Sequence, residues 1–148
     1  MWATIAAEAS SESRLWSDAL LPESEWQLVG VFSPLGDAKY ALGIETIYEG
    51  YLVHYGSPRL FAPPDPDTAL LLGDYLYAHG LVRIAATGRV DAVAELAELI
   101  SVCSRLRAEG EEGDAEAWLA CAVALGPQPP DDEAAERALA AHRSRIAR

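Results

Sequence analysis

The sequence predicts an all-α fold, a single-domain bundle of about six helices with one central apolar helix. The chain has 148 residues, of which 51% are hydrophobic, so it can bury a core without disulfides or a metal ion. Glycines and prolines divide it into pieces of helical length, and no segment alternates convincingly between polar and apolar residues as a strand does. We therefore assign residues 1–148 to one helical domain.

The first part of the chain is expected to hold three helices. A helix over residues 2–20 stops before Pro22, and a short one covers residues 23–31. A Ser-Pro-Leu-Gly turn follows, after which Asp37 can cap a helix that continues to residue 55. A proline-rich loop then leads into the central helix.

The central helix is expected over residues 65–88. Asp65 can cap it, Pro66 fits its first turn, and Gly88 can end it in a left-handed conformation. Gly73 and Gly80 lie on one line of this helix, where the missing side chains would let a neighbouring helix come close. We expect neighbours to cover three of its sides.

Asp74 stands in the middle of this apolar helix. At 100° per residue it lies roughly opposite Arg83, so these two side chains cannot pair within the helix. We expect Asp74 to be a buried structural acid that pairs with a side chain from another helix.

The second part of the chain is expected to hold three further helices. An amphipathic helix covers residues 90–108, and a short one over residues 114–125 carries Trp118. The last helix, over residues 131–148, begins with acids and ends with arginines, which suits the helix dipole. Residues 127–148 are poor in large apolar side chains, and we expect this segment to dock loosely.

The charge balance excludes some classes of partner. A formal charge of -12, with 23 acidic and 11 basic residues, argues against binding to nucleic acid or anionic lipid. Asp74, His79 and Arg83 would be costly at the centre of a bilayer, so a membrane span is not expected. The N-terminus shows no secretory signal, and we expect a cytoplasmic protein with Cys103 and Cys121 as buried thiols.

Two features of residues 37–55 suggest a site. Glu45 and Glu49 lie one helical turn apart, within reach of one cation, beside a broad tyrosine-rich face. One interpretation is an aromatic-lined pocket next to a carboxylate pair; the other is a tyrosine packing face with a solvated acidic edge. No Glu-x-x-His pair or Cys/His spacing typical of a metal site occurs, and we read His54 as a helix-end residue.

Residues 69–78, Ala-Leu-Leu-Leu-Gly-Asp-Tyr-Leu-Tyr-Ala, resemble the Gly-Asp-Tyr-Leu helix of trans-type polyprenyl diphosphate synthases. In that family the preceding helix carries Glu-x-Ile-His and later His-Asp-Asp, followed by an arginine-bearing loop. Here Glu45, Ile47 and His54 follow in similar order, and Arg59 corresponds to an arginine that contacts the diphosphate. The resemblance covers residues 41–106, under half of the chain.

The same resemblance implies a protein without catalysis. Tyr55 and Gly56 stand where the family has its first two metal-binding aspartates. Those aspartates hold the magnesium ions that neutralise the departing diphosphate, a role that a tyrosine and a glycine cannot fill. The chain is thus similar to a truncated, degenerate subunit of a heteromeric prenyl synthase.

We therefore expect a non-catalytic prenyl-synthase-like protein that binds a catalytic partner subunit or an isoprenoid chain, with no cofactor and no metal. Residues 37–55 and 65–88 would pack antiparallel around an apolar cavity. The side chains expected to contact the ligand are Tyr48, Tyr51, Tyr55, Arg59, Asp74 and Tyr75. Two alternatives stay open: an unrelated helical interaction module or homodimer, and a small helical enzyme that uses Glu45, Glu49, His54 and Asp74.

Overall fold

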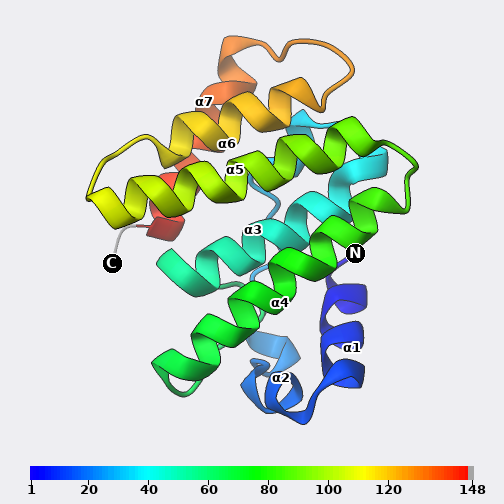
Figure 1. The fold of residues 1–148 in the computed structure, drawn as a ribbon, viewed down its shortest axis with the longest axis vertical. Coiled ribbons are helices and arrows are strands. Elements are labelled where there is room, and N and C mark those ends of the chain that lie inside the picture. Colours follow the sequence, from blue (N-terminus) through cyan, green and yellow to red (C-terminus); the bar gives the residue numbers. More distant parts are fainter. Residues whose placement is uncertain (147–148) are drawn as a thin grey trace.

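Two antiparallel helices, α3 (Ala41–Tyr55) and α4 (Pro66–Ala85), cross the middle of the molecule (Figure 1). This computed structural model describes residues 1–146. One side of the α3–α4 pair is covered by α5 (Val90–Glu109), α6 (Asp114–Ala124) and α7 (Asp132–Ile146), and the other side by α1 (Trp2–Glu12) and α2 (Arg14–Ala19). The described residues contain no strand apart from an isolated bridge between Leu20 and Phe61. The prediction of an all-α, single-domain bundle is confirmed.

The N-terminal region differs from the prediction in two places. The helix expected over residues 2–20 is divided at Ser13, whose backbone is extended and whose hydroxyl accepts a hydrogen bond from the amide of Leu15. The helix expected over residues 23–31 is reduced to a 3₁₀ turn, Glu23–Glu25. Beyond it, the amide of Gln27 donates to the carbonyl of Arg59, so a tertiary contact replaces the local helical bond.

The predicted boundaries of the later helices are largely confirmed. Asp65 accepts a hydrogen bond of 2.7 Å from the amide of Thr68 and so caps α4. Gly88 follows α4 with a φ of 81°, and Gly110 ends α5 with a φ of 68°. Asp37 caps a short 3₁₀ turn that leads into α3, rather than α3 itself.

The central helix of the bundle is α3, and the assignment of this position to residues 65–88 was wrong. Every residue from 43 to 53 of α3 is buried. In contrast, α4 leaves more than half of the Leu70, Leu71 and Val82 side chains exposed. The reason is that α1, α3 and α5 pack on α4 from its other sides and leave one stripe of its surface uncovered.

Helices α3 and α4 come close to each other at two pairs of glycines, Gly50 with Gly73 and Gly43 with Gly80. The alignment of Gly73 and Gly80 on one line of α4 predicted this close approach of a neighbouring helix. A Cβ atom on Gly50 would lie 2.9 Å from the carbonyl oxygen of Gly73, and one on Gly43 would lie 3.3 Å from that of Gly80. The antiparallel packing is thus confirmed. The expected apolar cavity is not formed at these two crossing points, because the backbones touch there.

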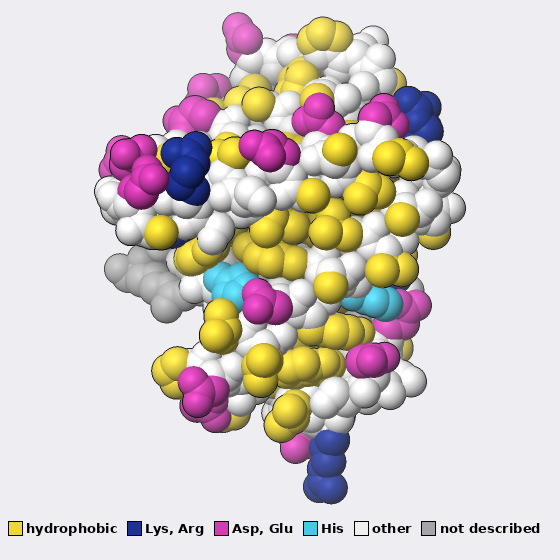
Figure 2. Space-filling model, viewed as in Figure 1, with side chains coloured by type: hydrophobic (Ala, Val, Ile, Leu, Met, Phe, Trp, Pro, Cys, Tyr) yellow, Lys and Arg dark blue, Asp and Glu magenta, His cyan; other side chains and the backbone are white. Residues whose placement is uncertain are grey.

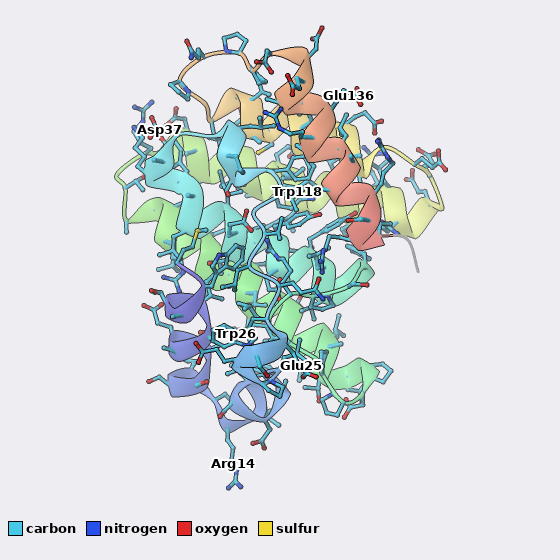
Figure 3. All side chains as sticks on the ribbon, turned by 180° about the vertical axis from the view of Figure 1, so that it is seen from behind. Arg14, Glu25, Trp26, Asp37, Trp118 and Glu136 are labelled. Atoms are coloured by element: carbon cyan, nitrogen blue, oxygen red, sulfur yellow. The ribbon has the colours of Figure 1, made fainter. Side chains whose placement is uncertain are left out.

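Two clusters of buried side chains lie on either side of this contact. One joins α3 to α5, α6 and α7 around Trp118, and the other joins α4 to α1 and α2 around Trp16. Figure 3 shows Trp118 beneath α7, whereas Arg14 and Glu136 extend outward. The segment expected to dock loosely contributes Ala138 to the first cluster and places the buried His142 against Phe32, and its last two residues lie outside the described part of the chain.

Candidate functional site

The two carboxylates predicted as a pair on α3 close around Arg59, which follows in the next loop. Both carboxylates and the guanidinium are fully buried. Nη1 of Arg59 donates to Glu45, and Nε donates to Glu49 at 3.0 Å. The Glu49 carboxylate also accepts the backbone amides of Arg59 and Leu60, at 2.9 and 2.8 Å. The cation that Glu45 and Glu49 share is therefore the chain's own arginine.

Glu45 and Glu49 thus form a buried ion triad with Arg59. Burial alone would lower the pKa of Arg59, but the carboxylates of Glu45 and Glu49 raise it above its ordinary value. The guanidinium also lies 4.6 Å from the ring centre of Trp2. The expectation of a solvated acidic edge was wrong, because neither carboxylate reaches water.

The tyrosine-rich face of α3 packs into a closed aromatic cluster. Tyr48 and Tyr51 are buried, and their ring centres lie 5.0 and 5.7 Å from that of Trp118. The ring of Phe32 stacks on that of Trp118 at 5.6 Å and meets the ring of Tyr48 edge to face at 5.6 Å. The hydroxyl of Tyr48 forms a hydrogen bond of 2.8 Å with Nδ1 of His142. These rings fill the space that one interpretation assigned to a ligand.

Tyr51 belongs to a second polar group that joins α3, α5 and α6. Its hydroxyl donates to Oδ2 of Asp114 at 2.5 Å, and Nε of Arg107 donates to the same oxygen at 2.7 Å. Burial and the hydrogen bond to Asp114 raise the pKa of Tyr51, so the phenol stays protonated. Tyr55 lies next to this group, with its ring centre 4.9 Å from the guanidinium carbon of Arg107.

Asp74 pairs with His54 of α3, so its partner comes from another helix, as predicted. Its Oδ1 lies 3.2 Å from Nε2 of His54. Asp74 is not buried, however, since 66% of its side chain is exposed. The difference follows from its place on the uncovered stripe of α4. Burial lowers the pKa of His54 despite the opposing effect of Asp74, so the imidazole is predominantly neutral at pH 7.

Tyr75 lies on a different side of α4. Its ring stacks on Trp16 at 5.6 Å and on His79 at 5.4 Å. On the same side, Glu8 of α1 forms an ion pair with Arg83 of α4 and a hydrogen bond of 2.7 Å with Nε2 of His79. These contacts fasten α1 to α4.

The six side chains expected to contact a ligand thus lie in separate places. Tyr48 and Tyr51 are in the aromatic cluster with Tyr55 beside it, Arg59 is in the triad, and Asp74 and Tyr75 are on two sides of α4. The groups of the enzyme alternative are divided in the same way, because Glu45 and Glu49 bind Arg59 while His54 binds Asp74.

A cleft that the sequence did not indicate lies where α5, α6 and α7 meet. Its volume is about 740 Å³, and its walls include Arg107, Glu112, Asp114, His142 and Arg143. Residues 110–113, between the helices predicted over residues 90–108 and 114–125, form one edge of this cleft. The lining residues come from positions up to 39 apart in the sequence, Arg107 and Ile146, so no local pattern could identify them.

Three further findings concern metal ligands, membrane spans and cysteines among the described residues. They contain no group of three or more His, Cys, Asp or Glu side chains placed to hold a metal ion. Among the helices described, none is long and apolar enough to cross a membrane. Both cysteines, Cys103 and Cys121, are buried free thiols, as predicted.

The resemblance to polyprenyl diphosphate synthases rests on the quoted residues alone. Comparison of the chain with protein-family models, curated proteins and solved structures finds no significant match.

Proposed function

We propose that this chain is a non-catalytic helical subunit that binds a partner protein through the outer face of α4. This face is the stripe formed by Leu70, Leu71, Asp74, Ala78, Val82 and Ala85, all of them exposed. At 100° per residue these side chains fall within about one third of the helix circumference, over about 22 Å of its length. Figure 2 shows hydrophobic side chains gathered over α4 and the adjoining α5.

The observation that carries the proposal is the exposure of three large apolar side chains on one stripe. Leu70, Leu71 and Val82 are 56%, 55% and 63% exposed. Single exposed apolar residues are common, but an aligned set on one helix is typical of a surface that another protein covers. A partner helix laid along this face would bury all three.

The charges of the chain favour a partner of different sequence over a second copy. Two copies would each carry a formal net charge of -12, which opposes their association, and would bring Asp74 of each outer face of α4 into the interface. A partner with basic residues around an apolar strip would be attracted instead. Charge complementarity therefore supports a heteromeric complex.

The resemblance of α3 and α4 to prenyl synthases makes a catalytic chain of that class the first partner to test. Support for the non-catalytic role comes from the buried triad, since Glu45 and Glu49 are held by Arg59. The glycine contacts between α3 and α4 leave no room for an isoprenoid chain at the crossing points, so a protein partner is better supported than that ligand.

The experiment mixes the purified chain with prenyl synthase chains from its own host and measures complex formation by analytical ultracentrifugation. We expect wild type to form a heteromer and Leu71→Glu to lose it, because a charge would be buried in the interface. Leu15→Glu is the matched control, since Leu15 is 54% exposed on α2. Equal binding by both variants, or no complex with any host chain of this class, would refute the proposal.

The absence of catalysis is tested separately. The isolated chain should not condense allylic and homoallylic diphosphates in the presence of magnesium. Sustained turnover by the pure protein would contradict the non-catalytic role even if a complex forms.

A further inference from the structure

Asp74 is the charged member of the outer face of α4, and His54 of α3 lies beside it. Oδ1 of Asp74 is 3.2 Å from Nε2 of His54. The two side chains differ in their exposure, since 66% of Asp74 but only 11% of His54 reaches water. A partner that covers the outer face would therefore take Asp74 out of water, and His54 would remain in contact with it.

The surroundings of His54 make Asp74 its main electrostatic neighbour. The rings of Tyr55 on α3 and Tyr77 on α4 lie 5.5 and 5.1 Å from the imidazole, and burial raises the pKa of both phenols, so neither is charged near neutral pH. On α5, Cys103 is a buried thiol, and Arg107 lies over the ring of Tyr55 while it pairs with Asp114. Asp74 is the charged group that raises the pKa of His54, against the larger, opposite effect of burial.

Removal of water changes the balance between the two charge states of this pair. With His54 neutral, a covered Asp74 would be an anion out of water without a compensating charge, which is costly. With His54 protonated, the pair would have no net charge, and the attraction between the two ions would be stronger than in water because the dielectric constant is lower. Covering the outer face of α4 therefore favours the protonated form of His54.

We propose that the outer face of α4 binds its partner in a pH-dependent way, because His54 takes up a proton when the partner covers Asp74. This inference rests on the partner binding proposed above and names how that binding is regulated. In the free chain the pKa of His54 lies below its ordinary value of 6.5, and in the complex it is higher. Binding thus strengthens as the pH falls through the interval between the two pKa values, by at most about tenfold per pH unit.

The test measures the dissociation constant of the full chain with its host prenyl synthase chain at pH 7.5 and pH 6.0, by analytical ultracentrifugation. We expect wild type to bind about tenfold more tightly at pH 6.0. His54→Gln keeps a hydrogen-bond donor for Asp74 but does not titrate, so it should lose this dependence. Groups of the partner can also titrate, and the comparison between wild type and His54→Gln separates their effect from that of His54.

His79→Gln is the matched control. His79 is also a histidine in contact with an acidic side chain, but its Nε2 bonds Glu8 of α1 at 2.7 Å, away from the outer face of α4. This variant should keep the pH dependence of wild type. Equal pH dependence in His54→Gln and wild type would overturn the inference, while the complex and the proposed function would stand.

Asp74→Asn tests the other member of the pair, and its exposed position makes it compatible with folding. We expect it to bind about tenfold more tightly than wild type at pH 7.5 and to lose the pH dependence, because no charge is then covered. Weaker binding would show that a basic side chain of the partner neutralises Asp74, and would overturn the inference. If no complex forms at either pH, the partner binding itself is refuted and this inference with it. If His54→Gln fails to fold, Asp74→Asn decides.

Discussion

The hydroxyl of Tyr48 and Nδ1 of His142 lie 2.8 Å apart in the core and join the central helix α3 to α7. His142 is 4% exposed and lies against the ring of Phe32. Burial lowers the pKa of His142 from 6.5 to about 4. Folding therefore holds this imidazole in its neutral form at pH values at which the unfolded chain would protonate it.

This pKa shift predicts that acid destabilises the fold. Well above pH 6.5, His142 is neutral in both the folded and the unfolded chain. Between pH 6.5 and about 4 it is protonated mainly in the unfolded chain, so the free energy of unfolding falls as the pH drops. The loss from His142 is at most about 3 kcal/mol. Urea denaturation at a series of pH values measures it.

His142→Asn is the control for the pH effect, since asparagine can still bond Tyr48 but does not titrate in this range. The variant should show a shallower dependence of stability on pH. Some slope will remain, because burial also lowers the pKa of His54. Parallel curves for the wild type and the variant would contradict the assignment to His142.

The triad of Arg59, Glu45 and Glu49 predicts a large effect for removal of its cation. Arg59→Met leaves two fully buried carboxylates without their positive partner. Removal of one member of a buried ion pair costs about 3–5 kcal/mol. We expect this loss, or failure to fold, in chemical denaturation.

The two glutamates of the triad should not be equivalent. Glu49 accepts hydrogen bonds from the backbone amides of Arg59 and Leu60 in addition to the guanidinium, whereas Oε1 of Glu45 has no hydrogen-bond partner among the described residues. Glu49→Gln is therefore expected to cost more stability than Glu45→Gln. The reverse order would show that the loop after α3 does not depend on Glu49.

Local signals predicted much of this fold, because they act within a few residues. The cap at Asp65 and the left-handed Gly88 need only their own neighbours, and both stand where expected. The line of Gly73 and Gly80 follows from the helical period alone, so close packing of another helix could also be predicted.

The candidate site could not be predicted in the same way. Tyr51 and Asp114 are 63 positions apart, and nothing in either segment indicates that they share a hydrogen bond. The central position was assigned to residues 65–88 and not to α3, because the charged side chains of Glu45 and Glu49 indicate a partly solvent-exposed helix. Arg59, which allows them to be buried, lies on a loop whose return path the sequence does not show.

The two cysteines are predicted to be unreactive in the native protein. Burial raises the pKa of Cys103 and of Cys121 to about 12, so on the order of one thiol in 10,000 is ionised at pH 8. Labelling with a disulfide reagent should be slow in buffer and fast in urea. Leu15→Cys supplies an exposed thiol as the reference. Native cysteines that react as fast as this reference would contradict their burial.

Gly50 and Gly43 should respond differently to alanine, although both lie in α3. Helix propensity alone would make either change stabilising by about 1 kcal/mol. A Cβ atom on Gly50 would meet the backbone oxygen of Gly73 at 2.9 Å, so α4 itself must move. On Gly43 the nearest atoms belong to the buried Ile84 side chain, so a side chain must move before the backbone of α4 does.

We therefore expect Gly50→Ala to destabilise the protein by about 1–3 kcal/mol and Gly43→Ala by less. Denaturant midpoints at constant slope give both values. Because the two changes have the same helix propensity, their difference isolates the cost of separating α3 from α4. A stabilising effect of Gly50→Ala would mean that the two backbones do not touch at Gly73.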